Sequence, residues 1–150
     1  MAECAACQEN YLAVVRGLVF AVLVHHGRYM QHPHSRAGTA EKTFLLSELS
    51  ELLSYISRHY TEDITIEDLC GVSNMSKSTL QRKMTAGIGY SPLQYVQRLR
   101  TSHAAVLLQD KSIPITEVAT RSGYNSISSF NRCFINRFGV SPTQWQKNAN

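Results

Sequence analysis

The sequence contains no apolar run long enough to cross a membrane. Its longest, residues 18–24, is far shorter than the roughly 20 residues that a transmembrane helix needs, and no secretory leader pattern precedes it. Only eight glycines and four prolines occur among the 150 residues, which excludes collagen-like and linker-like chains. These absences predict a soluble cytoplasmic protein. The length of 150 residues allows one ordinary domain, or a small domain with an appendage.

Cysteines are too few for a disulfide framework, but the spacing of two of them raises the question of a zinc site. Cys4 and Cys7 form a C-x-x-C pair, and four histidines follow: His25, His26, His32 and His34. These residue types bind zinc, but no second C-x-x-C pair stands at a familiar zinc-site distance. We therefore expect no metal and no cofactor, and interpret these side chains as reactive or incidental surface groups.

Acidic residues are scarce in the second half of the chain. Residues 69–150 carry ten Lys or Arg against only Asp110 and Glu117, a net charge of +8, whereas residues 1–68 carry a net charge of −4. Such an excess of positive charge is typical of a protein that binds nucleic acid. On charge alone, a basic surface that is merely solvated explains the pattern equally well.

Apolar residues recur at helical spacing along most of the chain, and no alternating strand pattern interrupts them. Residues 1–30 contain one broad apolar stripe, typical of a separate N-terminal helix. Residues 31–43 lack periodicity and are expected to form a linker. Helical patterns resume at Phe44 and continue to the end, so residues 44–150 are expected to form an all-α domain.

An internal repeat organises that domain. Residues 64–70 match residues 113–119, and residues 80–84 and 89–95 match residues 130–134 and 139–145. Each unit reads as a helix, a tight turn and a second helix. In the first unit, Asn74 suits the turn and Ser76 suits the start of the second helix; in the second, Gly123 and Ser126 take those places. The pattern predicts lobes over residues 44–90 and 110–147, bridged by a helix over residues 92–109.

A helix-turn-helix inserts its second helix into the major groove of DNA, where the outward side chains read base edges. The outward faces predicted here carry matching pairs, Gln81–Arg82 and Asn131–Arg132. Arg pairs with guanine, and Gln or Asn with adenine. For either helix alone, a solvated surface is an equal alternative. Two matched copies within one basic half favour the recognition of DNA.

The bridging helix sets the distance between the lobes. About 17 residues at 1.5 Å each give a spacer of roughly 25 Å, against about 34 Å for one turn of B-DNA. The two second helices could thus enter successive major grooves of a somewhat bent duplex. Arg98 and Arg100 lie on this spacer, where they either contact phosphates or serve as structural and solvated surface groups.

Residues 50–146 resemble the DNA-binding domain of the AraC/XylS family of bacterial transcription regulators. In the first unit and the spacer, the matching residues are Met75, Ser76, Leu80, Gln81, Arg82, Gly89, Tyr90, Ser91, Pro92, Tyr95, Arg98, Leu99, Arg100, Ala104, Leu107 and Leu108. In the second unit, they are Ile115, Val118, Ala119, Gly123, Tyr124, Ser128, Ser129, Phe130, Arg132, Phe134, Phe138, Gly139, Val140, Ser141 and Pro142. The chain departs from the family pattern at Cys70, Met84 and Gln146.

The resemblance implies a seven-helix domain of two helix-turn-helix lobes that binds double-stranded DNA in promoters. The side chains then expected to face bases or phosphates are Ser78, Gln81, Arg82 and Thr85 in the first lobe and Ile127, Ser128, Asn131 and Arg132 in the second. Further phosphate contacts are expected from Lys77, Lys83, Arg98 and Arg137. RNA polymerase is the expected protein partner, and the protein is expected in the cytoplasm, at the nucleoid when bound.

Most members of this family also carry an effector-binding barrel before a helical dimerisation segment. Residues 1–43 are too few for that barrel, so the chain is either the C-terminal part of a longer regulator or a short member that acts alone. The apolar helix expected over residues 8–30 is then a homodimer surface, a helix that lies on its own domain, or a helix whose apolar face is exposed by truncation.

Two other function classes compete with DNA binding. One is a metal- or thiol-dependent enzyme centred on the N-terminal Cys and His residues, and the other is a protein-interaction module built on the N-terminal helix. The sequence shows no nucleophile elbow, phosphate loop or paired-carboxylate site, and we expect no enzyme activity.

Overall fold

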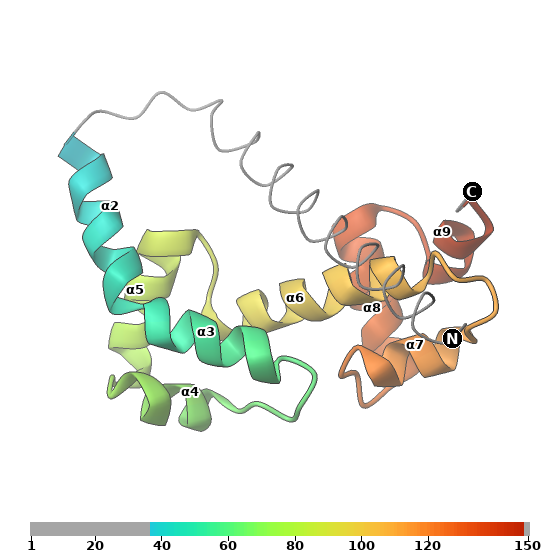
Figure 1. The fold of residues 1–150 in the computed structure, drawn as a ribbon, viewed down its shortest axis with the longest axis horizontal. Coiled ribbons are helices and arrows are strands. Elements are labelled where there is room, and N and C mark those ends of the chain that lie inside the picture. The colour runs from blue at the N-terminus through green and yellow to red at the C-terminus, as the bar shows by residue number, and fades with distance from the viewer. Residues whose placement is uncertain (1–36, 149–150) are drawn as a thin grey trace, which may run out of the picture. The chain divides into compact units, whose positions relative to one another are not determined.

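The computed structural model describes residues 37–148, and their side chains from Thr43 onward. This part of the chain contains eight α-helices and no strand, which confirms the all-α fold (Figure 1). The helices are α2 (Ala37–Glu48), α3 (Ser50–His59), α4 (Ile66–Ser73), α5 (Lys77–Ile88), α6 (Pro92–Leu107), α7 (Ile115–Arg121), α8 (Ile127–Phe138) and α9 (Pro142–Asn148). The predicted N-terminal helix, the C-x-x-C pair and the four nearby histidines lie outside the described residues.

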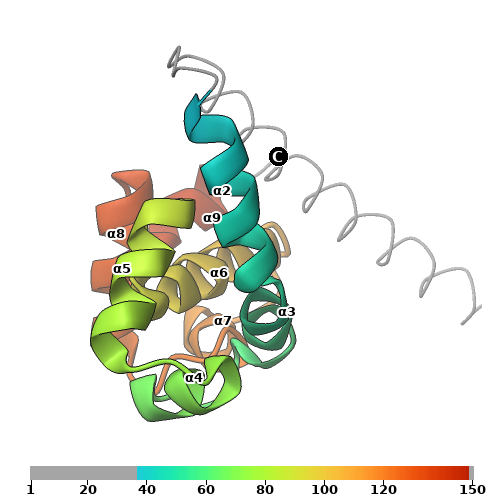
Figure 2. The ribbon, with the colours of Figure 1, turned by 90° about the vertical axis from the view of Figure 1, so that its left-hand side faces the viewer.

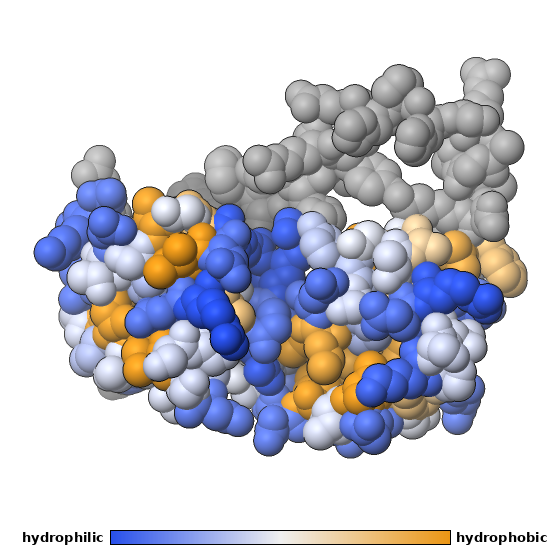
Figure 3. Space-filling view, turned by 180° about the vertical axis from the view of Figure 1, so that it is seen from behind, coloured by the Kyte–Doolittle hydropathy of each residue, from blue (hydrophilic) through white to orange (hydrophobic). Residues whose placement is uncertain are grey.

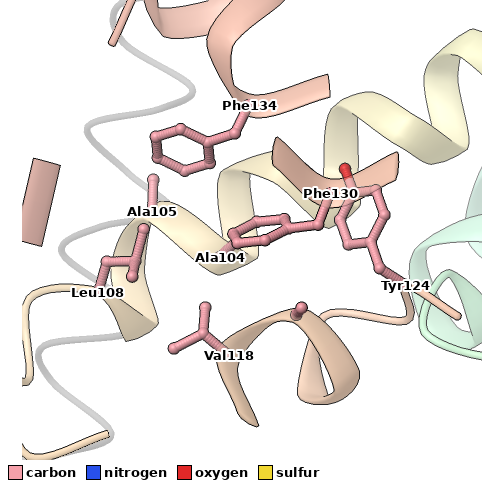
Figure 4. Packing of buried hydrophobic residues seen from close by; sticks show 8 residues of the cluster. Ala104, Ala105, Leu108, Val118, Tyr124, Phe130 and Phe134 are labelled. Carbon is pink, nitrogen blue, oxygen red and sulfur yellow. The ribbon is translucent and has the colours of Figure 1, made fainter. Parts of the chain in front are cut away.

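Two hydrophobic cores define two lobes, one at each end of α6 (Figure 1). The first core joins α3, α4 and α5, and its buried members are Leu49, Leu52, Ile56, Leu69, Leu80, Met84 and Val96. The second joins α7 and α8, with buried members Ala104, Ala105, Leu108, Val118, Ala119, Tyr124, Phe130 and Phe134 (Figure 4). Because α6 supplies residues to both cores, it is the bridge between the lobes that the repeat predicted.

The first helix-turn-helix is α4 followed by α5. Thr65 begins α4 in a capping box with Asp68, and Asn74 ends it in the left-handed conformation, with φ of 51°. Ser76 then caps α5 by accepting a hydrogen bond from the backbone N–H of Thr79 at 3.4 Å. The turn and the cap both lie where the sequence predicted them.

The second helix-turn-helix, α7 and α8, follows the same plan with a different turn residue. Gly123 takes the left-handed conformation, with φ of 85°, and Ser126 caps α8 by accepting from the N–H of Ser129 at 3.2 Å. Both second helices end at a left-handed glycine, Gly89 for α5 and Gly139 for α8. The two units of the repeat therefore fold alike.

Residues 37–43 differ from the prediction, because they belong to α2 and not to a linker. The rest of α2 packs on α5, and Gly87 of α5 lies close to Leu45 of α2 and to Leu49. This contact between distant segments supports a helix where the sequence shows no periodicity. The seven helices α3–α9 correspond to the expected seven-helix domain, and α2 precedes them.

The bridging helix is slightly shorter than predicted and ends at Leu107, not at residue 109. The Asp110 carboxylate accepts hydrogen bonds from the backbone N–H and the hydroxyl of Ser112, at 2.9 and 2.6 Å. Such a local turn competes with the helix and directs the chain towards α7. None of the helices in residues 37–148 is both long and apolar enough to cross a membrane.

Candidate nucleic-acid interface

The helices α5 and α8 lie on the same side of α6, at its two ends. Figure 2 views the molecule from the end of the first lobe, and both helices appear on its left, opposite α3. The 16 residues of α6 correspond to a spacer of roughly 24 Å. Figure 3 shows the molecule from the back of the view in Figure 1, so that this face is towards the reader. On it, hydrophilic side chains are interspersed with apolar patches. The arrangement can present two helices to one elongated partner.

In α5, burial separates the core side from the outward side. Leu80 and Met84 are completely buried in the first core. The four side chains predicted to face DNA, by contrast, are all exposed: Ser78, Gln81, Arg82 and Thr85. Within the described part of the chain no ion pair engages Arg82, so its guanidinium is available to a ligand.

In α8, the fully buried Phe130 and Phe134 face the second core. Of the four predicted side chains on the other side, Ile127, Ser128 and Arg132 are exposed, and Asn131 is half-buried. Ile127 and Ile135 are among the few large apolar residues exposed in the described chain, at 39% and 44%. The outward face of α8 therefore combines donors with apolar groups that suit a thymine methyl.

The predicted phosphate contacts on α5 differ in availability. Lys77 is exposed. Lys83, however, donates to both carboxylate oxygens of Glu48 on α2, each at 2.9 Å. Glu48 escaped the sequence analysis because it lies 35 residues from Lys83, and no local pattern joins the two positions.

Arg98 on α6 and Arg137 on α8 make contacts within the protein. Arg137 donates to the backbone carbonyl of Arg98 and lies over the ring of Phe138. Burial lowers the pKa of Arg137 to about 10, so it stays charged at neutral pH. Arg98 lies over the ring of Tyr90, 4.7 Å from its centroid.

Arg100 and Gln146 also have partners within the protein. Arg100 donates to the backbone carbonyls of Tyr60 and Glu62, both at 2.6 Å, and is thus a structural residue. The side-chain amide of Gln146 donates to the carbonyls of Asp110 and Ile113. No cluster of His, Cys, Asp or Glu suited to a metal ion occurs among the described residues.

Comparison with known proteins identifies the matched region. A family model described as "Helix-turn-helix domain" matches residues 69–148. The chain is 32% identical over 93 residues to the probable transcriptional regulator LumQ of Photobacterium leiognathi, covering 62% of this chain and 38% of LumQ. The chain spans only about a third of the length of the curated relatives that it matches, between 34% and 38%. These relatives are named transcriptional regulators, which agrees with the prediction that the chain is not an enzyme.

Solved structures show the same arrangement of helices. A probable AraC family transcriptional regulator from Rhodopseudomonas palustris matches with a TM-score of 0.62 and 27% identity, over 69% of this chain and 98% of that one. The DNA-binding domain of AdpA, a global transcriptional factor solved in complex with a target DNA, matches with a TM-score of 0.62 and 28% identity. That match covers 66% of this chain and 89% of the AdpA chain.

Proposed function

Because the chain belongs to the AraC/XylS family of helix-turn-helix transcription regulators, we propose that it binds double-stranded DNA at specific sequences. In this proposal α5 and α8 enter successive major grooves on one side of the duplex. Each helix reads one short half-site, and α6 sets the separation between them.

The observation that carries the proposal is the pair of matched outward faces. Gln81 and Arg82 on α5, and Asn131 and Arg132 on α8, occupy equivalent places in the two units of the repeat. The helices α5 and α8 lie on the same side of α6 (Figure 2). Arg donates in a fork to guanine O6 and N7, and the amide of Gln or Asn pairs with adenine N6 and N7. Two such faces support a composite site with one half for each lobe.

Charge supports the same proposal. The net charge of +8 in residues 69–150 attracts the phosphate backbone, and each neutralised phosphate releases a counterion. We expect the affinity for DNA to fall steeply as the salt concentration rises. The preference for particular bases is not expected to fall in the same way. The exposed Lys77 is the phosphate contact that the geometry supports best, because Lys83, Arg98 and Arg137 already have partners within the protein.

Three finer expectations belong to the same proposal. Regulation requires contact with RNA polymerase, and the N-terminal segment of residues 1–30 would supply a homodimer surface through its apolar stripe. A DNA-binding regulator of this family would act in the bacterial cytoplasm, at the nucleoid when bound.

The test is a selection of random duplexes by the purified chain at about 150 mM salt, followed by sequencing. The proposal expects enriched duplexes with two short half-sites about one helical turn apart. Binding without any enriched motif would reduce the activity to generic attraction to phosphate. No binding at low or moderate salt would instead favour a protein-interaction module.

A further inference from the structure

The two lobes touch each other directly, beside the helix that joins them. The contact lies between the loop after α3 and the turn between α7 and α8. A Cβ atom placed on Gly123 would lie only 2.7 Å from both the Cα and the carbonyl oxygen of Thr61. Real Cβ atoms do not approach backbone so closely, so any side chain at residue 123 would push the two lobes apart.

The turn alone does not explain why this residue is a glycine. The turn of the first unit needs the same left-handed conformation and obtains it with Asn74, whose side chain is exposed. Gly123 is buried, and the Thr61 backbone occupies the space of its missing side chain. The residue in the first turn therefore needs only to adopt a positive φ. The residue in the second turn must also leave room for the contact between the lobes.

The helix α6 holds both sides of this contact. On the side of the first lobe, Arg100 donates to the carbonyls of Tyr60 and Glu62, which flank Thr61. On the side of the second lobe, the buried hydroxyl of Thr101 lies 2.8 Å from the hydroxyl of Tyr124, the residue after Gly123. Neighbouring residues of α6 thus anchor the loop and the turn that meet each other. We call this set, Thr61, Arg100, Thr101, Gly123 and Tyr124, the interlobe seam.

A closed seam restrains motion that a lone helix would permit. A tilt of about 10° at the middle of a spacer of roughly 24 Å moves each end by about 2 Å. That displacement exceeds half of the 3.4 Å rise per base pair. The relative orientation of the lobes therefore decides which base pairs α5 and α8 reach together.

We propose that Gly123 and Arg100 are positioning residues that lock the two lobes in one orientation and thereby fix the spacing between the two DNA half-sites. The effect on the spacing of DNA half-sites rests on the proposed function. The fixed orientation of the two lobes does not depend on it. The interlobe seam thus determines which distance between half-sites the protein binds, although the seam itself contacts no base.

Matched glycine variants test the lock. Gly123→Ala and Gly139→Ala both place a side chain at a left-handed residue of the second lobe, with φ of 85° and 76°. Only Gly123→Ala meets backbone, because nothing lies within 4 Å of a Cβ at Gly139. Residual dipolar couplings on the full chain are expected to fit one alignment for both lobes in the wild type and in Gly139→Ala. In Gly123→Ala the lobes are expected to require two alignments or a changed mutual orientation.

The second readout is the spacing in selected DNA. We expect the wild type and Gly139→Ala to select a single spacing, and Gly123→Ala to select a broadened or shifted one while each half-site keeps its own base preference. A folded Gly123→Ala with the wild-type orientation and spacing would overturn the proposal. If that variant does not fold, Arg100→Lys provides the same two readouts, with Arg58→Lys as its control. Should the wild type select no motif, the proposed function fails, while the dipolar couplings still decide whether the seam locks the lobes.

Discussion

Lys83 on α5 donates to both carboxylate oxygens of Glu48 on α2, each at 2.9 Å. The pair joins α2 to the helix that we assign to the major groove, and it neutralises a cation predicted to contact phosphate. Both side chains are partly exposed, at 23% and 31%, so the pair adds at most about 1 kcal/mol to stability. Its larger effect is expected on binding, because it withholds a positive charge from DNA.

Removing the acid should release this charge. Glu48→Gln is expected to strengthen DNA binding and to steepen the dependence of log K on log salt by about one unit, the contribution of one more phosphate contact. Titrations at several salt concentrations measure the slope. The control is Glu51→Gln, which removes an exposed acid of α3. An unchanged slope in Glu48→Gln would show that Lys83 does not reach phosphate.

Each recognition arginine should control one half-site. Arg82→Ala and Arg132→Ala are each expected to cost about 1–3 kcal/mol of binding free energy and to relax base preference in a different half of the site. Arg58→Ala removes an exposed arginine from α3, on the opposite side of the molecule (Figure 2), and should change neither. If both recognition variants bind with wild-type affinity and preference, the assignment of these residues fails.

The left-handed turn of the first unit predicts a contrast at Asn74, whose φ is 51°. Asn and Gly tolerate this conformation, whereas other residues pay about 1–2 kcal/mol. Asn74→Gly should therefore change the free energy of unfolding by less than about 0.5 kcal/mol, and Asn74→Ala should lower it by about 1 kcal/mol. Urea unfolding of both variants measures the difference. Equal stability of the two would contradict a role for backbone conformation.

His103 should make stability depend on pH. Burial lowers its pKa below the ordinary 6.5, and its ring lies edge-on to Tyr60. Because the unfolded chain binds this proton more readily, the free energy of unfolding should fall as the pH drops below about 6.5. His103→Gln should lose this part of the pH dependence when both proteins are unfolded in urea at pH 7.5 and 5.5. The same pH dependence in both would show that His103 is not its source.

Local sequence predicted the parts of the fold that local physics determines. Ser76 and Ser126 mark helix starts because their hydroxyls satisfy backbone N–H groups. Asn74 and Gly123 mark turns because they tolerate positive φ. The repeat then placed the outward faces of α5 and α8, because buried and exposed positions alternate with the helical period.

Contacts between distant segments were beyond that reasoning. No local pattern indicates that Glu48 reaches Lys83 or that Thr61 meets Gly123, because these pairs form only after the lobes fold. The same holds for Arg137, whose charge suggested a phosphate contact although its side chain is half-buried and donates to the carbonyl of Arg98. Charge and spacing identify candidates for binding, and tertiary contacts determine which of them stay available.

Hydroxyl-radical footprinting on a selected duplex tests the central claim most directly, that α5 and α8 read successive major grooves from one side of DNA. We predict two protected windows whose centres lie about 10 base pairs apart on the same face of the duplex. Arg82→Ala should weaken one window and Arg132→Ala the other. A single window, or two windows on opposite faces of the duplex, would contradict this account.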